Sequence, residues 1–154
     1  KIYSHKYIRM KATIQVEKGG DKNFSTYMIE SIPKFGIHGY GSSAREAIAD
    51  TYVSIEEYKQ QAAAESLDFP ELELTFRFDI GSFFNYYSFL NISEVAKRIG
   101  INASLMRQYV NGTKTASDKR IKQINDCVHT LATDMASVVL HGVSLKEINT
   151  GVPE

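Results

Sequence analysis

Residues 92–111 read ISEVAKRIGINASLMRQYVN, a segment with helical spacing on both sides of Gly100. Such spacing indicates two short helices, and glycine suits the turn between them because it adopts a positive φ angle without steric cost. Two helices that cross steeply need a small residue where they touch and apolar residues around that point. The chain supplies these residues at Val95, Ala96, Ile99, Ile101, Met106 and Tyr109. The segment therefore predicts a helix-turn-helix.

The outer side of the second helix is the candidate nucleic-acid interface. If Met106 and Tyr109 point inward, Arg107 and Gln108 point to solvent. A guanidinium group matches the acceptor pair of guanine, and an amide matches the donor and acceptor of adenine. Nearby cations, amides and hydroxyls are typical phosphate contacts. The alternative is a helical bundle whose outer face is only solvated. The candidate DNA-binding residues are Ala103, Ser104, Arg107, Gln108, Lys97, Asn111, Thr113, Lys114 and Lys119.

The charges of the chain are balanced overall but segregated along it. The 154 residues include 18 basic and 18 acidic side chains, so no net charge points to a nucleic-acid or membrane partner. Residues 41–80 contain nine acids and three bases, whereas residues 90–125 contain seven bases and two acids. This segregation predicts an acidic half and a basic half with different partners, although random variation on a solvated surface is the bland alternative.

Capping residues delimit the helices of the second half. Asn91 and Asn102 stand where they can cap the two short helices, and Ser117 opens a long helix that we expect to run to about residue 140. Ahead of them, residues 83–90 hold six apolar or aromatic side chains among eight. One helix face cannot hold them all, so we expect this aromatic helix to be buried on two sides, between domains or between subunits. This aromatic helix is the basis for predicting that the protein forms dimers.

The first half alternates between strand and helix patterns. Residues 43–64 place apolar side chains at three- and four-residue intervals, which indicates an amphipathic helix. Ser43 and Glu46 have the spacing of a capping box at its start. Period-two alternation and turn residues around the helix indicate short strands, so the first half reads βββαβ. The expected strands are residues 11–18, 24–31, 35–40 and 72–78.

These patterns predict an α+β protein of two domains. An N-terminal βββαβ sheet-and-helix domain would occupy residues 10–80, and an all-α helix-turn-helix domain residues 81–141. Residues 1–9 read as an extension or cloning remnant ahead of an original start at Met10, and residues 142–154 read as a tail.

Residues 82–136 resemble the Cro/C1-type (XRE-like) helix-turn-helix family, most clearly from Val95 to the closing Tyr-Val-Asn-Gly at residues 109–112. In that family the start and the exposed face of the second helix read base edges. The resemblance carries this role to Ala103, Ser104, Arg107 and Gln108.

The first half, followed by such a domain, resembles the HicB antitoxin family. The βββαβ order, the step Ile32–Pro33 and the run GYGSSAREA at residues 39–47 carry the resemblance. It implies a partial RNase H-like fold that binds and blocks a small, basic, HicA-like ribonuclease toxin. It also implies a homodimer or higher oligomer that represses its own operon on double-stranded DNA. The family often has Pro-Gly-Cys where this chain has Pro33, Lys34 and Phe35, and no toxin-binding residue is assigned.

Two other functions stay open at this point. One is a stand-alone transcriptional regulator whose first domain binds a ligand or sets the oligomer. The other is a scaffold that binds no DNA. Catalysis is not expected, because an RNase H-like nuclease needs carboxylates that converge on metal ions, and Glu17, Glu46 and Asp79 read as surface charges.

No cofactor and no metal site are expected. Cys127 has no histidine or cationic cluster close in sequence, so it reads as a packing residue. No apolar run approaches the ~20 residues of a membrane helix, and residues 1–9 contain no signal-peptide core. We therefore expect a cytoplasmic protein without a membrane partner. The histidines, which lack metal-ligand spacing, are His5, His38, His129 and His141.

Overall fold

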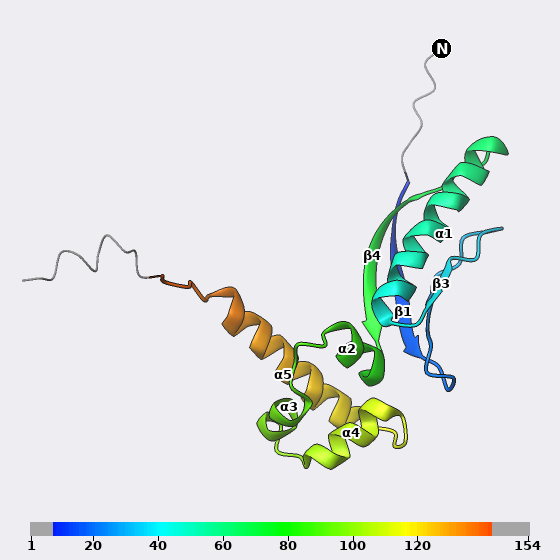
Figure 1. The fold of residues 1–154 in the computed structure, drawn as a ribbon. Helices are drawn as coiled ribbons and strands as arrows, with labels where there is room; N and C mark the ends of the chain where they lie inside the picture. The colour runs from blue at the N-terminus through cyan, green and yellow to red at the C-terminus, as the bar shows by residue number, and fades with distance from the viewer. Residues whose placement is uncertain (1–7, 143–154) are drawn as a thin grey trace, which may run out of the picture. The chain divides into compact units, whose positions relative to one another are not determined.

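The computed structural model describes residues 8–142, which fold as a mixed α+β chain with one four-stranded sheet and five helices (Figure 1). The chain divides into two compact units, one up to Thr115 and one from Ala116 onward. Among the described residues, no helix is both long and apolar enough to cross a membrane. The expected extension at residues 1–9 and the tail at residues 142–154 fall almost entirely outside the described residues.

The sheet of the first unit contains all four expected strands. They are β1 (Arg9–Lys18), β2 (Phe24–Met28), β3 (His38–Gly41) and β4 (Glu71–Phe78), in the spatial order β3-β2-β1-β4. The first three are antiparallel neighbours, whereas β4 lies parallel to β1. A parallel neighbour requires a crossover connection, and the helix between β3 and β4 supplies it.

That helix, α1 (Ala44–Ala64), covers one face of the sheet. Ser43 caps it, because its hydroxyl accepts a hydrogen bond of 3.1 Å from the backbone N–H of Glu46. In a capping box the carboxylate of Glu46 would accept a hydrogen bond from the backbone N–H of Ser43, but its bonds here come from Ser42. The Glu46 carboxylate accepts from the backbone N–H and the hydroxyl of Ser42, at 2.9 and 2.6 Å. These bonds from Ser42 hold the pKa of Glu46 below its ordinary value.

Close contact between α1 and the sheet depends on Gly39. A Cβ atom at this position would lie 2.3 Å from the carbonyl oxygen of Ala47, so only glycine lets the helix approach β3 this closely. The hydroxyls of Thr26 and Thr51 share a hydrogen bond beneath the helix, and the Thr51 hydroxyl also lies within hydrogen-bond distance, 2.9 Å, of the carbonyl oxygen of Ala47. Around them lies the buried core, made of Ile14, Val16, Phe24, Ile32, Phe35, Ile37, Ala44, Ala47, Ile48, Ile55 and Ala62.

Two strands are shorter than the sequence pattern predicts. β2 ends at Met28 rather than at residue 31, because the Glu30 carboxylate takes the backbone N–H of Thr13 at 2.6 Å, which interrupts the ladder. β3 begins at His38 rather than at residue 35. A tight turn precedes it, in which Lys34 has a φ angle of 72°.

The aromatic segment forms a shorter helix than predicted. α2 spans Ile80–Tyr86, and the expected continuation to residue 90 is wrong because Tyr87 already ends the helix. Asp79 caps its start by accepting from the backbone N–H of Ser82 at 2.6 Å. A Cβ atom on Gly81 would lie 2.7 Å from the carbonyl oxygen of Val110, so α2 packs closely on the helix that contains Val110 as well as on the sheet.

The remaining helices are α3 (Ile92–Arg98), α4 (Ala103–Asn111) and α5 (Asp118–Ala136). The first two complete the first unit, and α5 belongs to the second. Ser117 caps α5 as predicted, but the helix ends at Ala136 rather than near residue 140. The predicted domain boundary between residues 80 and 81 stays a prediction.

Candidate nucleic-acid interface

The turn between α3 and α4 has the backbone that the sequence predicts. Gly100 has a φ angle of +73°. Its N–H and that of Ile101 donate to the carbonyl oxygens of Lys97 and Ala96, at 3.2 and 3.0 Å, and so satisfy the end of α3. A Cβ atom on Gly100 would meet nothing within 4 Å. Glycine is therefore required here for its φ angle and not for space.

The two helices pack through the expected small and apolar side chains. Ala96 and Met106 are fully buried, and Val95 and Tyr109 are also buried. Ile99 and Ile101 flank the turn and are half-buried. Because α4 has buried side chains at spacings of three, its opposite side must face outward.

Side-chain caps fix where both helices begin. The Asn91 side-chain oxygen accepts from the backbone N–H groups of Ser93 and Glu94, at 2.9 and 3.2 Å. The side-chain oxygen of Asn102 accepts from the N–H of Ser104 at 2.7 Å. Gly112, with a φ angle of +75°, ends α4. Both helix starts and the end of α4 therefore follow from local sequence.

The exposed side of α4 carries four of the nine predicted DNA-binding residues. Ser104, Arg107, Gln108 and Asn111 are exposed, whereas Ala103 is half-buried. The carbonyl oxygen of Gln108 accepts hydrogen bonds of 3.3 Å from the Thr113 hydroxyl and the Lys114 backbone N–H. Those two residues, in the loop after α4, are therefore fixed beside the helix end.

The cations of the predicted set fall into two groups. Lys97 at the end of α3 and Lys114 after α4 are exposed and lie in the same compact unit as Arg107. Lys119 lies in α5, which belongs to the other unit. The first unit therefore presents three of the four predicted cations together with the amides and hydroxyls of α4.

Sequence analysis did not identify Ser93 as a neighbour of the predicted DNA-binding face. The guanidinium of Arg107 donates a hydrogen bond of 2.7 Å from Nη2 to the hydroxyl oxygen of Ser93. Ser93 lies at the start of α3, fourteen positions earlier in the chain. Only the crossing of the helices brings these side chains together, so helical spacing within α3 or α4 carries no signal for it.

The carboxylates weighed as a nuclease site have separate structural roles. Asp79 caps α2, Glu46 binds Ser42, and Glu17 accepts a hydrogen bond of 3.2 Å from the Tyr27 hydroxyl. Across residues 8–142, no group of three or more His, Cys, Asp or Glu side chains is arranged to hold a metal ion.

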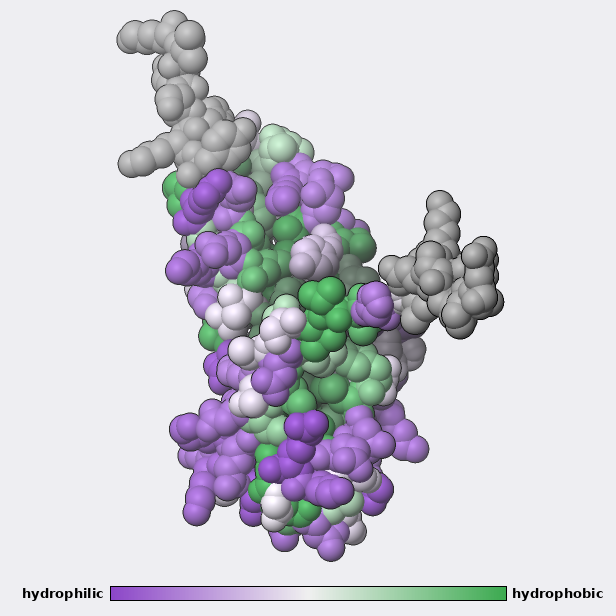
Figure 2. Space-filling view, turned by 90° about the vertical axis from the view of Figure 1, so that its left-hand side faces the viewer, coloured by the Kyte–Doolittle hydropathy of each residue, from purple (hydrophilic) through white to green (hydrophobic). Residues whose placement is uncertain are grey.

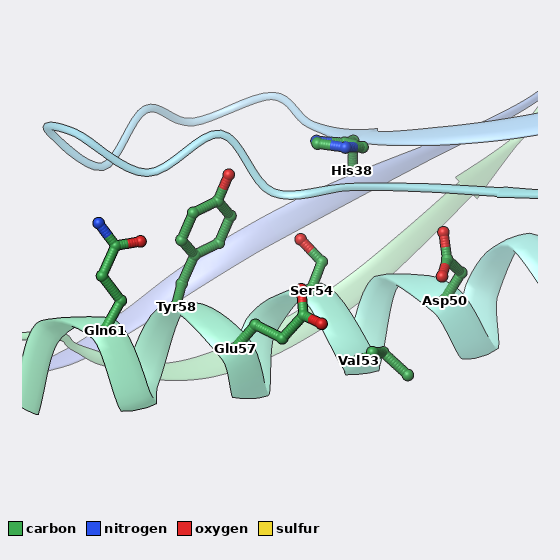
Figure 3. A pocket seen from close by; sticks show the side chains of 7 residues that line it. All are labelled: His38, Asp50, Val53, Ser54, Glu57, Tyr58 and Gln61. Atoms are coloured by element: carbon green, nitrogen blue, oxygen red, sulfur yellow. The ribbon is translucent and has the colours of Figure 1, made fainter.

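A small polar hollow lies between β3 and α1 (Figure 3). Ser54, Tyr58 and Gln61 rise from α1 toward the strand that carries His38. The Nδ1 atom of His38 lies 2.7 Å from the carbonyl oxygen of Gly36. The hollow has a volume of about 240 Å³, which is below the ~300–1,000 Å³ typical of small-molecule pockets. Its lining is completed by Asp50, Val53 and Glu57.

Comparison of the chain with protein-family models, with curated proteins and with solved structures finds no match.

Proposed function

We propose that the protein is a DNA-binding repressor that serves as the antitoxin of a type II toxin-antitoxin pair. In this proposal α3 and α4 form a Cro/C1-type helix-turn-helix, and the sheet with α1 forms a partial RNase H-like domain that holds a small, basic, HicA-like ribonuclease. The observation that carries the proposal is the division of α4 into a buried side and an exposed side. The helix buries Met106 and Tyr109 while Arg107 and Gln108 stay exposed on the other side.

The DNA-binding half of the proposal is supported by local geometry. A recognition helix presents its first turns and one exposed face to the major groove, where Arg and Gln form bidentate pairs with guanine and adenine. Lys97 at the end of α3 and Lys114 in the loop after α4 are long, exposed cations, a residue type that often contacts phosphates beside a recognition helix.

The toxin-binding half is supported by charge. On α1 the side chains of Glu46, Asp50, Glu56 and Glu57 are all exposed, in a stretch with three times as many acids as bases. An acidic helix attracts a basic partner and raises its association rate. The small volume of the hollow beside α1 favours a protein partner over a small molecule.

The stand-alone regulator is the second candidate. Among the described residues β4 is an edge strand, and this edge offers a site for oligomerisation in either candidate. The two candidates share the DNA-binding step and differ in whether a toxin is bound. In both, two copies would address half-sites about 34 Å apart or a multiple of that distance.

Two measurements test the two halves separately. DNase I footprinting on the DNA upstream of the protein's own gene is expected to show protection that competitor DNA does not remove. Co-expression with the small basic protein of the adjacent reading frame is expected to yield a complex, which Glu56→Lys with Glu57→Lys weakens and Lys22→Glu leaves intact. No complex at micromolar concentration would leave the regulator as the better account.

A further inference from the structure

One row of apolar side chains on the sheet is only partly covered. The inward-facing residues of β1, Ile14 and Val16, are completely buried, but their parallel neighbours on β4, Phe76 and Phe78, are half-buried. Leu72 and Leu74 are half-buried in the same way. The cause is the position of α1, which packs over β3, β2 and β1. Figure 2 shows hydrophobic side chains between hydrophilic ones on the face that it presents.

Tyr52 extends this partly covered row onto the helix. Its neighbour Thr51 is fully buried, whereas 51% of the surface of Tyr52 is exposed. Its ring lies 6.3 Å from that of Phe76, centroid to centroid. An exposed aromatic side chain beside a half-buried row of apolar residues is typical of an interaction surface.

The backbone of β4 is open on the same side. The N–H groups of Glu71 and Asp79 donate to the carbonyl oxygens of Ile8 and Val16, at 2.9 and 3.1 Å. The backbone N–H and C=O groups of successive residues in a strand point to alternate sides. Those of residues 72, 74, 76 and 78 therefore point away from β1. No strand among residues 8–142 pairs with them. The strand has eight residues and contains no proline, which would block pairing at an edge.

The charges along β4 are self-complementary. Glu73 and Arg77 are exposed on the face opposite α1, two residues before and two after Thr75. Neither forms an ion pair with another of the described residues. An antiparallel copy of β4, related by a two-fold axis at Thr75, would set Glu73 against the partner's Arg77 and Arg77 against the partner's Glu73. Cross-strand pairs of opposite charge are stabilising.

We propose that a second copy of this chain pairs antiparallel with β4 across this axis, so that two four-stranded sheets become one continuous sheet. In that register Leu74 faces the partner's Phe76, and Leu72 faces the partner's Phe78. The outward backbone N–H and C=O groups of residues 72, 74, 76 and 78 then form hydrogen bonds with the same groups of the second copy, as antiparallel pairing requires. A two-fold interface needs a surface that complements itself, and both the charges and the apolar row of β4 do so.

The inference deepens the proposed function, because a repressor of two half-sites needs two copies, but it is tested without DNA. Sedimentation equilibrium of the full chain gives the dimer dissociation constant. Glu73→Arg and Arg77→Glu each replace two attractive pairs by two repulsive ones, so each is expected to raise that constant at least about tenfold. The double variant Glu73→Arg with Arg77→Glu restores opposite charges and is expected to return within about threefold of the wild type.

Lys34→Glu is the matched control, since it reverses a charge in the turn between β2 and β3, at the other side of the sheet. It is expected to leave the dissociation constant unchanged. A wild-type protein that stays monomeric up to roughly 100 μM would overturn the inference, because that affinity is too weak to matter for a repressor. So would a dimer that both single reversals leave intact. Neither result depends on whether the protein binds DNA.

Discussion

The guanidinium of Arg107 in α4 is held by the hydroxyl of Ser93 in α3, through a hydrogen bond of 2.7 Å that joins an exposed side chain to a half-buried one. The bond keeps the Arg107 side chain on the outer side of the helix pair, near the position from which it would reach a base edge. Exposed hydrogen bonds contribute little net free energy, since water replaces them easily. Ser93 therefore orients Arg107 through a bond that costs little to break, and in the proposed DNA complex Arg107 would exchange this partner for a guanine.

Ser93→Ala tests whether this hydrogen bond matters for binding. We expect DNA affinity to change by less than about threefold, because the bond is worth about 1 kcal/mol or less and must be exchanged on binding. Fluorescence anisotropy with upstream DNA measures it. A loss as large as that of Arg107→Ala would mean that Ser93 itself contacts DNA.

Gly100→Ala tests the backbone of the turn. The added Cβ meets no atom within 4 Å, but the φ angle of +73° stays unfavourable for alanine, so we expect a loss of about 1–2 kcal/mol in the free energy of unfolding. Urea denaturation measures it. Gly20→Ala is the control, since its Cβ also meets nothing and its φ angle is not positive; it should be neutral or stabilising by up to about 1 kcal/mol. Equal effects of the two variants would contradict the assignment.

Met106→Ala tests the packing between α3 and α4. Met106 is fully buried, so its truncation should cost about 2–5 kcal/mol in the free energy of unfolding. Gln108→Ala, on the exposed side of the same helix, should cost no more than about 0.5 kcal/mol. If Met106→Ala were as mild as Gln108→Ala, the helix would not be oriented as described.

Glu30 makes the stability of the sheet depend on pH. The backbone N–H of Thr13 donates to its carboxylate at 2.6 Å and lowers the pKa of Glu30. A lowered pKa in the folded state means that the contribution is present above the pKa of the unfolded chain and is lost as the pH falls through the folded value. Glu30→Gln should therefore destabilise the protein at neutral pH and become equal to the wild type in acid.

Urea denaturation at neutral pH and at about pH 3 checks this expectation. Glu57→Gln is the matched control, because it makes the same substitution at an exposed carboxylate on α1. A Glu30→Gln difference that stays constant across the two conditions would refute the role of the carboxylate.

Features set by local spacing could be predicted from the sequence. The caps at Asn91, Asn102 and Ser117, the positive φ angle of Gly100 and the burial of Met106 all depend on residues within a few positions of each other. The βββαβ order was equally accessible, because period-two and helical patterns differ clearly. The same locality explains why the exposed side of α4 could be named in advance.

Features set by contacts between distant segments could not be predicted. The early end of β2 depends on Glu30 reaching Thr13, and the Arg107–Ser93 bond depends on the crossing of two helices. Tyr52 lies on α1 beside Phe76 of β4 but is half exposed, because the helix packs mainly over β3, β2 and β1. Hydrophobic spacing identifies a face of a helix but does not say how far that face extends over a sheet.

The most direct test of the account is fluorescence anisotropy of the protein with a labelled fragment of its own upstream DNA, titrated at several salt concentrations. We predict saturable binding that resists competitor DNA and that Arg107→Ala weakens about tenfold to a hundredfold. Lys114→Ala should instead weaken binding to all sequences and lower the salt slope by about one. An Arg107→Ala protein that binds as the wild type does, or a wild type that binds no DNA even at low salt, would contradict the account.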